Sequence, residues 1–128
     1  MSERTPLGRV RGDGAAKEGV GHWWAQRLTS IALVPLLVWL LFSLLSLPAL
    51  DHATVSAWMG APGRALLLIL LVAISAWHSQ LGVQVVIEDY VHGAGMKVLA
   101  LVVSSFAHVV IAAAGVLAVL SVSLRSAT

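Results

Sequence analysis

The chain has 128 residues, of which 59% are hydrophobic and only 11% are charged, and its mean hydropathy is +0.91. A soluble domain has about 45–50% apolar and about 25% charged residues, and a small one has too much surface to bury such an apolar excess. The composition therefore excludes an ordinary soluble domain and predicts an integral membrane protein. The net charge of +2, with the basic residues mainly at one end, argues against a nucleic-acid-binding protein.

The chain contains no cysteine. It can therefore hold no disulfide, catalytic thiol, cysteine-ligated zinc or iron–sulfur cluster of its own. Its five histidines are the strongest candidates for metal ligation. Two of them, His78 and His108, fall inside long apolar stretches, and the other three lie near the membrane interfaces or in loops.

Long stretches without a charged residue predict where the chain crosses the membrane. About 20 apolar residues, at about 1.5 Å of rise each, span the hydrocarbon core. Three stretches meet this length, and we expect an all-α membrane protein with three transmembrane helices at about 28–48, 65–90 and 97–124. Pro35 falls in the first of them, where a helix in a bilayer tolerates a kink.

The segments outside these helices are short. Residues 1–21 contain five glycines and mixed charges, which is typical of a flexible arm. Residues 54–59 have the pattern of a short interfacial helix, in which Trp58 would lie at the level of the lipid headgroups. The sequence has no internal repeat and no sign of a second domain, so residues 1–128 are predicted to form a single membrane domain.

The distribution of basic residues predicts the orientation, because lysine and arginine are enriched in cytoplasmic segments next to membrane helices. Six basic residues flank the membrane on one side, and only Arg64 and Arg125 lie on the other. The six are Arg4, Arg9, Arg11, Lys17, Arg27 and Lys97. We therefore expect the N-terminus and the loop after the second helix in the cytoplasm, and the C-terminus on the outer side.

His78 lies near the middle of the second predicted helix, where an ionisable side chain is costly and indicates a function. On a helical wheel of about 100° per residue, Ser75 and Gly82 share its face. A glycine one turn away leaves space for a flat macrocycle, and imidazole is a common axial ligand of haem iron. The alternative is a histidine that only hydrogen-bonds a neighbouring helix, and position alone does not decide between them.

The second helix ends in Glu88, Asp89 and Tyr90. Eleven residues separate Asp89 from His78, which in a regular helix returns to within about 20° of the same direction some 16–17 Å further along. A tyrosine hydroxyl beside a carboxylate at the membrane edge can hydrogen-bond a ligand carbonyl and relay protons. The alternative is an ordinary helix end, because tyrosine is common at membrane interfaces.

Two further polar side chains have two interpretations each. His108, near the middle of the third helix, is a rival ligand, but Ser104 and Ser105 beside it favour a hydrogen-bonded packing role. Arg27 enters the first helix from the cytoplasmic side. Its guanidinium either reaches lipid phosphate or pairs with a haem propionate or a quinone headgroup.

Together these residues resemble a known family. A histidine, ten residues and then Asp-Tyr on the second of three helices, here His78 and Asp89-Tyr90, resembles the motif of the hydrophobic membrane anchor of succinate dehydrogenase, the D-type subunit of respiratory complex II. The ending Asp89–Gly93 and the N-terminal stretch Gly19–Thr29 are similar to the mitochondrial and alphaproteobacterial branch. The resemblance covers the chain from about Leu7 to the third helix.

The resemblance implies a role for several residues. His78 would be an axial ligand of the iron of haem b, with the other ligand coming from a companion C-type cytochrome b anchor subunit, so that this chain forms half of a haem-binding bundle. Asp89 and Tyr90 would belong to the ubiquinone site, where Tyr90 donates to a quinone carbonyl and Asp89 helps to deliver protons. Arg27 would lie near the haem propionates. His108 is not part of the motif.

The predicted function is therefore that of a membrane-anchor subunit of succinate:ubiquinone oxidoreductase, in a bacterial inner membrane rather than a mitochondrial one. FAD and iron–sulfur clusters would lie only in the partner flavoprotein and iron–sulfur subunits, and the chain alone would have no activity. The alternatives are a quinol:fumarate reductase anchor and a non-redox small membrane scaffold or accessory subunit.

Overall fold

The structure of the chain, a computed structural model, describes residues 15–126. Four helices follow one another in this part of the chain: α2 (Ala15–Leu45), α3 (His52–Met59), α4 (Pro62–Tyr90) and α5 (Ala94–Ser126). Short loops join them, and the described residues contain no strand. The fold is all-helical, as the composition predicts.

Three of these helices are long and apolar enough to cross a membrane: residues 19–45 of α2, all of α4 and residues 94–125 of α5. Their 27, 29 and 32 residues exceed the roughly 20 that span the hydrocarbon core. A continuous helix satisfies its own backbone hydrogen bonds, which is why uncharged apolar segments of this length are helical in a bilayer. The prediction of three membrane-spanning helices is confirmed.

The first helix begins earlier than the sequence suggested. Residues 15–21, the first described turns of α2, belong to the segment expected to be a flexible arm, and residues 1–14 of that segment lie outside the described residues. Alanine, lysine and glutamate at the start of α2 are good helix formers, and they offset a cost of about 1 kcal/mol for each glycine that follows. The short helix expected at residues 54–59 is confirmed as α3.

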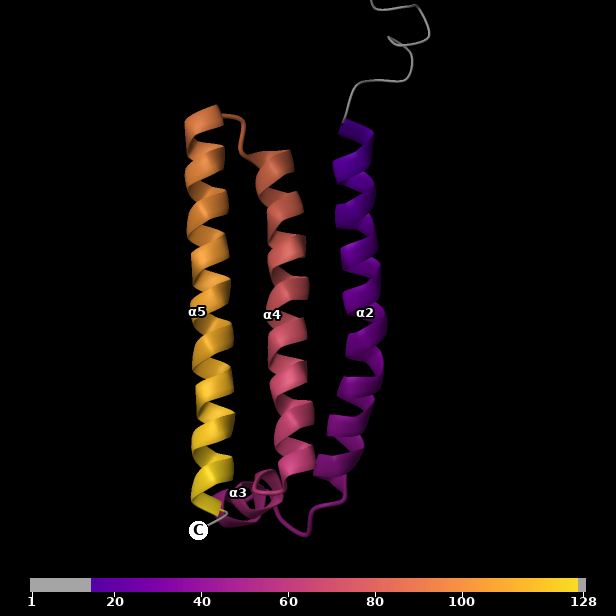
Figure 1. The fold of residues 1–128 in the computed structure, drawn as a ribbon, viewed down its shortest axis with the longest axis vertical. Coiled ribbons are helices and arrows are strands. Elements are labelled where there is room, and N and C mark those ends of the chain that lie inside the picture. The colour runs from indigo at the N-terminus through magenta and orange to yellow at the C-terminus, as the bar shows by residue number, and fades with distance from the viewer. Residues whose placement is uncertain (1–14, 127–128) are drawn as a thin grey trace, which may run out of the picture.

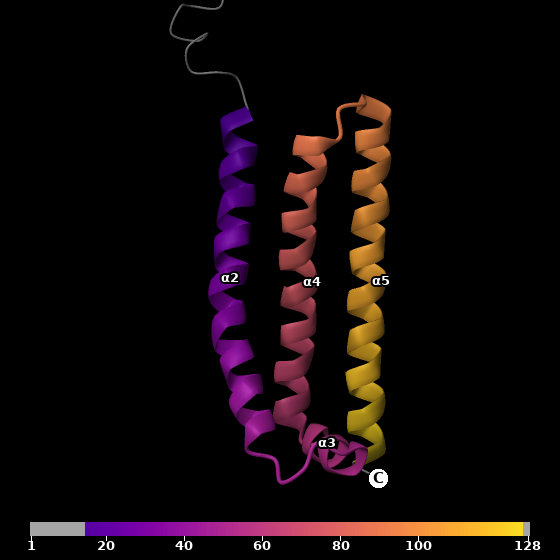
Figure 2. The same ribbon diagram turned by 180° about the vertical axis from the view of Figure 1, so that it is seen from behind.

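The three long helices lie side by side in one layer, with α4 in the middle (Figure 1). The view from behind shows the same order, with α3 at the end of α4 and α5 (Figure 2). α4 contacts both α2 and α5, whereas α2 and α5 do not contact each other within the described residues. One layer of helices encloses no core, and accordingly no side chain in the described part of the chain is completely buried.

α4 and α5 pack closely around Gly115. A Cβ atom at this position would lie 2.7 Å from Cγ1 of Val72, well inside the optimal separation of two carbon atoms. Glycine therefore lets the two backbones approach, as small residues commonly do in membrane helix pairs. A hydrogen bond of 3.0 Å from Gln80 Nε2 to Ser105 Oγ joins the same two helices.

An aromatic cluster joins α2, α3 and α4 at the end of the layer where α3 lies. The ring of Trp39 stacks on that of Trp58 at 5.7 Å between centroids and 26° between planes. The guanidinium of Arg64 lies 5.8 Å from the Trp58 ring, and its Nη1 donates to the Trp58 carbonyl at 3.1 Å. The ribbons of α2 and α4 converge toward this end (Figures 1 and 2), so the cluster holds the two helices together there.

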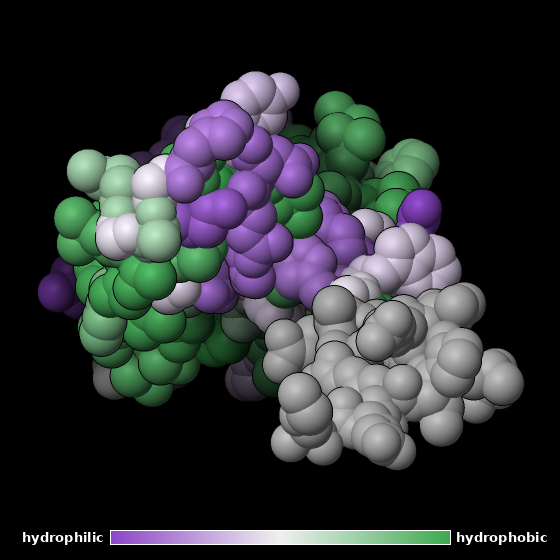
Figure 3. Space-filling model, turned by 90° about the horizontal axis from the view of Figure 1, so that it is seen from above, coloured by the Kyte–Doolittle hydropathy of each residue, from purple (hydrophilic) through white to green (hydrophobic). Residues whose placement is uncertain are grey.

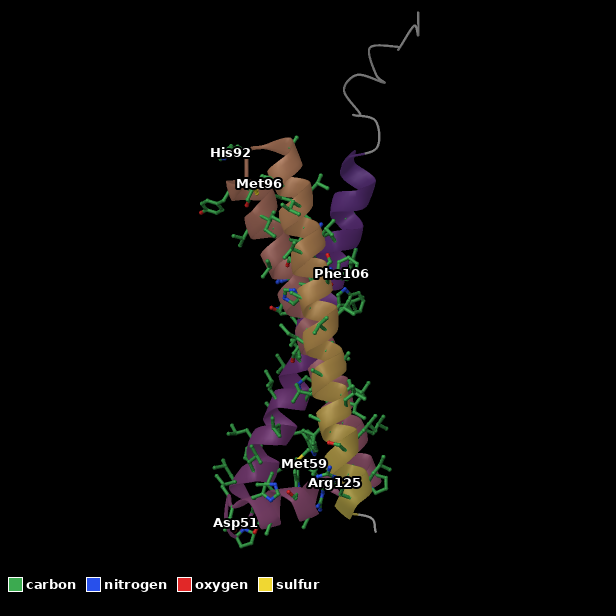
Figure 4. The ribbon with its side chains drawn as sticks, turned by 90° about the vertical axis from the view of Figure 1, so that its left-hand side faces the viewer. Asp51, Met59, His92, Met96, Phe106 and Arg125 are labelled. Carbon is green, nitrogen blue, oxygen red and sulfur yellow. The ribbon has the colours of Figure 1, made fainter. Side chains whose placement is uncertain are left out.

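Asp51 caps the N-terminus of α3. Its carboxylate accepts hydrogen bonds from the backbone N–H of Thr54 at 2.9 Å and from the Thr54 hydroxyl at 3.0 Å. These bonds lower the pKa of Asp51 because they stabilise its charged form. The cap therefore contributes fully above the ordinary carboxyl pKa and is lost as the pH falls through the lowered value. Figure 4 shows Asp51 at the same end as Met59 and Arg125, far from His92.

The opposite end of the layer is polar. Exposed side chains there include Glu88, Asp89 and Tyr90 at the end of α4 and His92 in the loop to α5. Seen from this end, hydrophilic surface gathers around the loop, and the flanks of the helices are hydrophobic (Figure 3). The two ends of the molecule are therefore distinct, and the Asp-Tyr pair lies at the polar one.

Candidate functional site

His78 lies in the middle part of α4 and is half-buried. Its Nδ1 is 2.9 Å from the hydroxyl Oγ1 of Thr29 in α2. Thr29 is the one polar side chain that is buried in the described part of the chain, with only 3% of its surface exposed. This hydrogen bond joins residues 49 positions apart, so it ties the imidazole ring to the neighbouring helix.

The other ring nitrogen of His78 is free. No residue in the described part of the chain hydrogen-bonds its Nε2, and the atom does not belong to the buried polar atoms that lack a partner. Nε2 is therefore accessible from outside the chain. An accessible, unpaired imidazole nitrogen in a membrane helix is available to a ligand or a metal.

His108 in α5 differs from His78 in this respect. Its Nδ1 is 2.8 Å from the Ser104 carbonyl, to which it donates. Its Nε2 is 3.2 Å from the hydroxyl of Ser79 in α4, which then acts as the donor. Both ring nitrogens are used within the chain, so His108 joins α4 to α5 through hydrogen bonds.

The face of α2 that meets α4 carries more polar groups than the sequence analysis considered. His22, Gln26 and Thr29 follow one another at intervals of four and three residues, which places them on one side of a helix. Nε2 of His22 and Oε1 of Gln26 are buried without a hydrogen-bond partner in the described structure. A hollow of about 240 Å³ lies beside them, lined by Gly19, His22, Gln84 and Glu88.

Gly82, one turn beyond His78, faces this side of α2. A Cβ atom at Gly82 would lie 3.9 Å from Gln26 Nε2, which is an ordinary contact and the nearest among the described residues. The packing of this chain therefore does not require a glycine at position 82, in contrast to position 115. The missing side chain at Gly82 therefore leaves some space on the face of α4 that meets α2.

The end of α4 presents two side chains without partners. Tyr90 is 77% exposed, Asp89 is exposed, and neither is hydrogen-bonded within the described part of the chain. Glu88 is engaged instead: its Oε1 accepts from Gln84 Nε2 and its carbonyl accepts from Lys97 Nζ, both at 2.8 Å. Because α4 is continuous from Pro62 to Tyr90, the predicted alignment of Asp89 with His78 along one helix face holds.

Arg27 lies on another side of α2. Its guanidinium is 5.3 Å from the ring of Trp23, and the side chain is exposed. Two residues separate it from Thr29, a rotation of about 200° around the helix. The structure therefore does not bring Arg27 to His78, and any group that Arg27 contacts must approach from outside the chain.

The chain matches the model of the succinate dehydrogenase/fumarate reductase transmembrane subunits over residues 1–120. It belongs to this family. The succinate dehydrogenase hydrophobic membrane anchor subunit of Rickettsia conorii is 37% identical over 84 residues, which are 65% of this chain and 67% of the relative. That of Rickettsia bellii is 36% identical over 69% of this chain and 70% of the relative.

The anchor subunit of Paracoccus denitrificans is 31% identical over 110 residues, which cover 86% of this chain and 85% of the relative. No solved structure matches the chain. The predicted membrane anchor of succinate dehydrogenase is thus confirmed, and membership of the family implies the other subunits of such a complex as partners. A fumarate reductase anchor, one of the two alternatives, belongs to the same family.

The sequence motifs indicate His78, Asp89, Tyr90 and Arg27 in this family member, but they do not include the polar face of α2. A signal was present, because His22, Gln26 and Thr29 recur at helical spacing within a largely apolar segment. The pattern was hidden because the predicted helix began at about residue 28, so that His22 and Gln26 lay before it.

Proposed function

We propose that this anchor subunit binds haem b through His78 and forms part of a ubiquinone-reduction site with Asp89 and Tyr90, as one of two anchors of a succinate:ubiquinone oxidoreductase. The observation that carries the haem assignment is the free Nε2 of His78, set against the fully hydrogen-bonded ring of His108. Of the two intramembrane histidines, His78 alone offers a lone pair without breaking a hydrogen bond.

The haem assignment also agrees with the metal-ligating side chains that this chain offers. Within residues 15–126, no three histidine, cysteine, aspartate or glutamate side chains gather to hold a metal ion. Imidazole is a common ligand of haem iron, and His78 alone would hold the haem from this chain. Bound haem b supplies a one-electron redox centre within the membrane. His78 would hold it and Gly82 would leave space for its ring, whereas Arg27, on another side of α2 from Thr29, would pair with a propionate only if that group reached around the helix.

The quinone assignment rests on the exposed end of α4. Tyr90 has a hydroxyl that can donate to a quinone carbonyl, and Asp89 has a carboxylate that can pass protons from the aqueous side. Neither group has a partner within the described residues. The distribution of basic residues favours a cytoplasmic position for this end, where a soluble flavoprotein and an iron–sulfur subunit would dock and deliver electrons from succinate.

The proposed complex lies in a bacterial inner membrane, with a C-type cytochrome b anchor as the companion of this chain. The companion would supply the second axial ligand, and FAD and iron–sulfur clusters would remain in the soluble subunits. A companion anchor would also cover Nε2 of His78, a polar atom that is costly to leave against lipid.

A pair of alanine variants tests the haem assignment in the purified complex. His78→Ala is expected to remove most of the b-type signal from the reduced-minus-oxidised spectrum, because the iron loses an axial ligand. His108→Ala, the matched control in the neighbouring helix, is expected to retain the signal. A full signal in the His78 variant would contradict the proposal, and so would loss of the signal in an assembled His108 variant.

A further inference from the structure

The hydroxyl of Thr29 has three partners within hydrogen-bond distance. Oγ1 lies 2.8 Å from the Ala25 carbonyl, 3.0 Å from the Gln26 carbonyl and 2.9 Å from Nδ1 of His78. A hydroxyl has a single proton to donate and two lone pairs that accept. Both carbonyl oxygens are acceptors only, so the imidazole is the one partner that can act as a donor.

This arrangement selects one tautomer of His78. If the Thr29 hydroxyl donated to Nδ1, its lone pairs would face two carbonyl oxygens at 2.8 and 3.0 Å with no proton between them, which is repulsive. The N–H of Nε2 would also lack an acceptor within the described part of the chain. If the hydroxyl donates to the carbonyls of its own helix instead, Nδ1–H donates to Oγ1, and Nε2 carries a lone pair and no unpaired N–H.

We propose that Thr29 is a positioning residue that holds the His78 imidazole in its Nδ1–H tautomer and fixes its orientation, so that Nε2 is presented as a lone pair for a metal. The inference rests on the proposed function, because it assigns a role toward a haem held by His78. Metal-ligating histidines commonly donate their second nitrogen to a protein acceptor, which fixes the tautomer and raises the basicity of the ligand. Here a buried threonine from the adjacent helix is that acceptor.

The geometry makes Thr29 suitable for this role. It is 3% exposed, so water does not compete for the hydroxyl. Two hydrogen bonds to the backbone of α2 hold its side chain in one rotamer. The position of the His78 imidazole is therefore fixed by the backbone of α2, through Thr29, as well as by the backbone of α4.

The test compares Thr29→Val, which keeps the shape and removes the hydroxyl, with Thr29→Ser, which keeps the hydroxyl, in the purified complex. The valine variant is expected to hold haem about 10- to 100-fold less tightly, the range for loss of such a partner. Its reduced haem is expected to bind carbon monoxide, because the ligand is less firmly held, and its reduction potential is expected to rise, because the imidazole is less basic. The serine variant is expected to match the wild type in all three measurements.

Ser79→Ala is the matched control. It removes the hydroxyl of Ser79, which joins α4 to α5 through a hydrogen bond with His108. Ser79 directly follows His78 in the chain. The variant is expected to leave haem retention, carbon monoxide binding and potential unchanged. An equal effect of Ser79→Ala and Thr29→Val would overturn the proposal, because the effect would then reflect helix packing.

Other results separate this inference from the proposed function. If His78→Ala loses the haem but Thr29→Val behaves like the wild type, the role of Thr29 is wrong and the haem assignment stands. If Thr29→Ser is as impaired as Thr29→Val, shape rather than the hydroxyl matters, and the inference is overturned. Failure of both Thr29→Val and Thr29→Ala to assemble would also overturn it, by assigning the hydroxyl to subunit folding. If His78→Ala retains haem, both assignments fall.

Discussion

His78 and His108 lie in neighbouring helices. Ser79, the residue after His78, hydrogen-bonds His108. The environments of the two histidine rings nevertheless differ. His108 gives both nitrogens to hydrogen bonds within the chain, whereas His78 gives one to Thr29 and leaves the other free. The motif favours His78 from sequence, and the hydrogen bonds favour the same residue for an independent physical reason.

At the same scale, Tyr90→Phe removes one hydroxyl from a side chain that is 77% exposed. The hydroxyl makes no hydrogen bond within the described residues, so the change should not disturb folding. Ubiquinone reduction is expected to fall by several-fold to about 10-fold, the worth of one hydrogen bond, while succinate oxidation with an artificial acceptor is retained. The ratio of the two activities in one membrane preparation checks this. Equal loss of both would indicate an assembly defect instead.

Single residues also show where sequence reasoning stops. The positions of His78, Asp89 and Tyr90 along one helix follow from helical spacing, and the continuous α4 retains them. The partner of His78 does not follow, because Thr29 is 49 residues away and only the packing of α2 against α4 brings them together. The direction of Arg27 depends on the same packing, since it lies about 200° from Thr29 around α2.

At the scale of elements, the long helices were predictable because length and hydropathy alone decide whether a segment spans a bilayer. Their ends were less predictable. The start of α2 was predicted too late, at about residue 28, because the uncharged stretch begins only after Arg27; Gly19 and Gly21, assigned to a flexible arm, also lie within the helix. α3 was predicted almost completely, and the structure adds the cap at Asp51.

Gly115 and Gly82 differ in what surrounds them. Gly115 lies in a close contact within the chain, whereas we propose that Gly82 leaves space for an external group. Substitution by alanine tests both positions. Gly115→Ala places a methyl group 2.7 Å from a branched, stiff valine, and we expect a loss of about 1–3 kcal/mol in stability. Gly82→Ala meets only an ordinary contact and is expected to reduce haem content without opening the helix pair. Thermal unfolding and the haem-to-protein ratio of the purified complex measure the two effects. An unchanged haem content in the Gly82 variant would contradict the proposed position of the macrocycle.

At the scale of the whole molecule, a single layer of three helices exposes both of its broad faces. Most large apolar side chains of α2, α4 and α5 are exposed, and lipid tails can cover them. Nε2 of His78 differs from these side chains, because it is polar, has no partner within the described residues, and polar groups in a membrane normally face other protein. This is the physical reason to expect a bundle that is completed by a second subunit.

The two ends of the layer also allow a direct test of orientation, because the chain has no native cysteine. His92→Cys, in the loop between α4 and α5, and Ala53→Cys, in α3, place one thiol at each end. The thiol at position 92 is expected to react with an impermeant reagent in inside-out vesicles, and the one at position 53 in right-side-out vesicles. Labelling after solubilisation in detergent is the control for reactivity. Reaction of both thiols from the same side would refute the predicted topology.

The stack of Trp39 on Trp58 provides a fixed point about which the rest of α2 can tilt. It fastens the helix at one end, beside Arg64, and Thr29 lies ten residues away, about 15 Å along the axis. A tilt of about 4° about this pivot moves Thr29 by about 1 Å, enough to break its 2.9 Å bond to His78. A displacement of α2 at the end where α3 lies would therefore move Thr29 relative to the imidazole of His78.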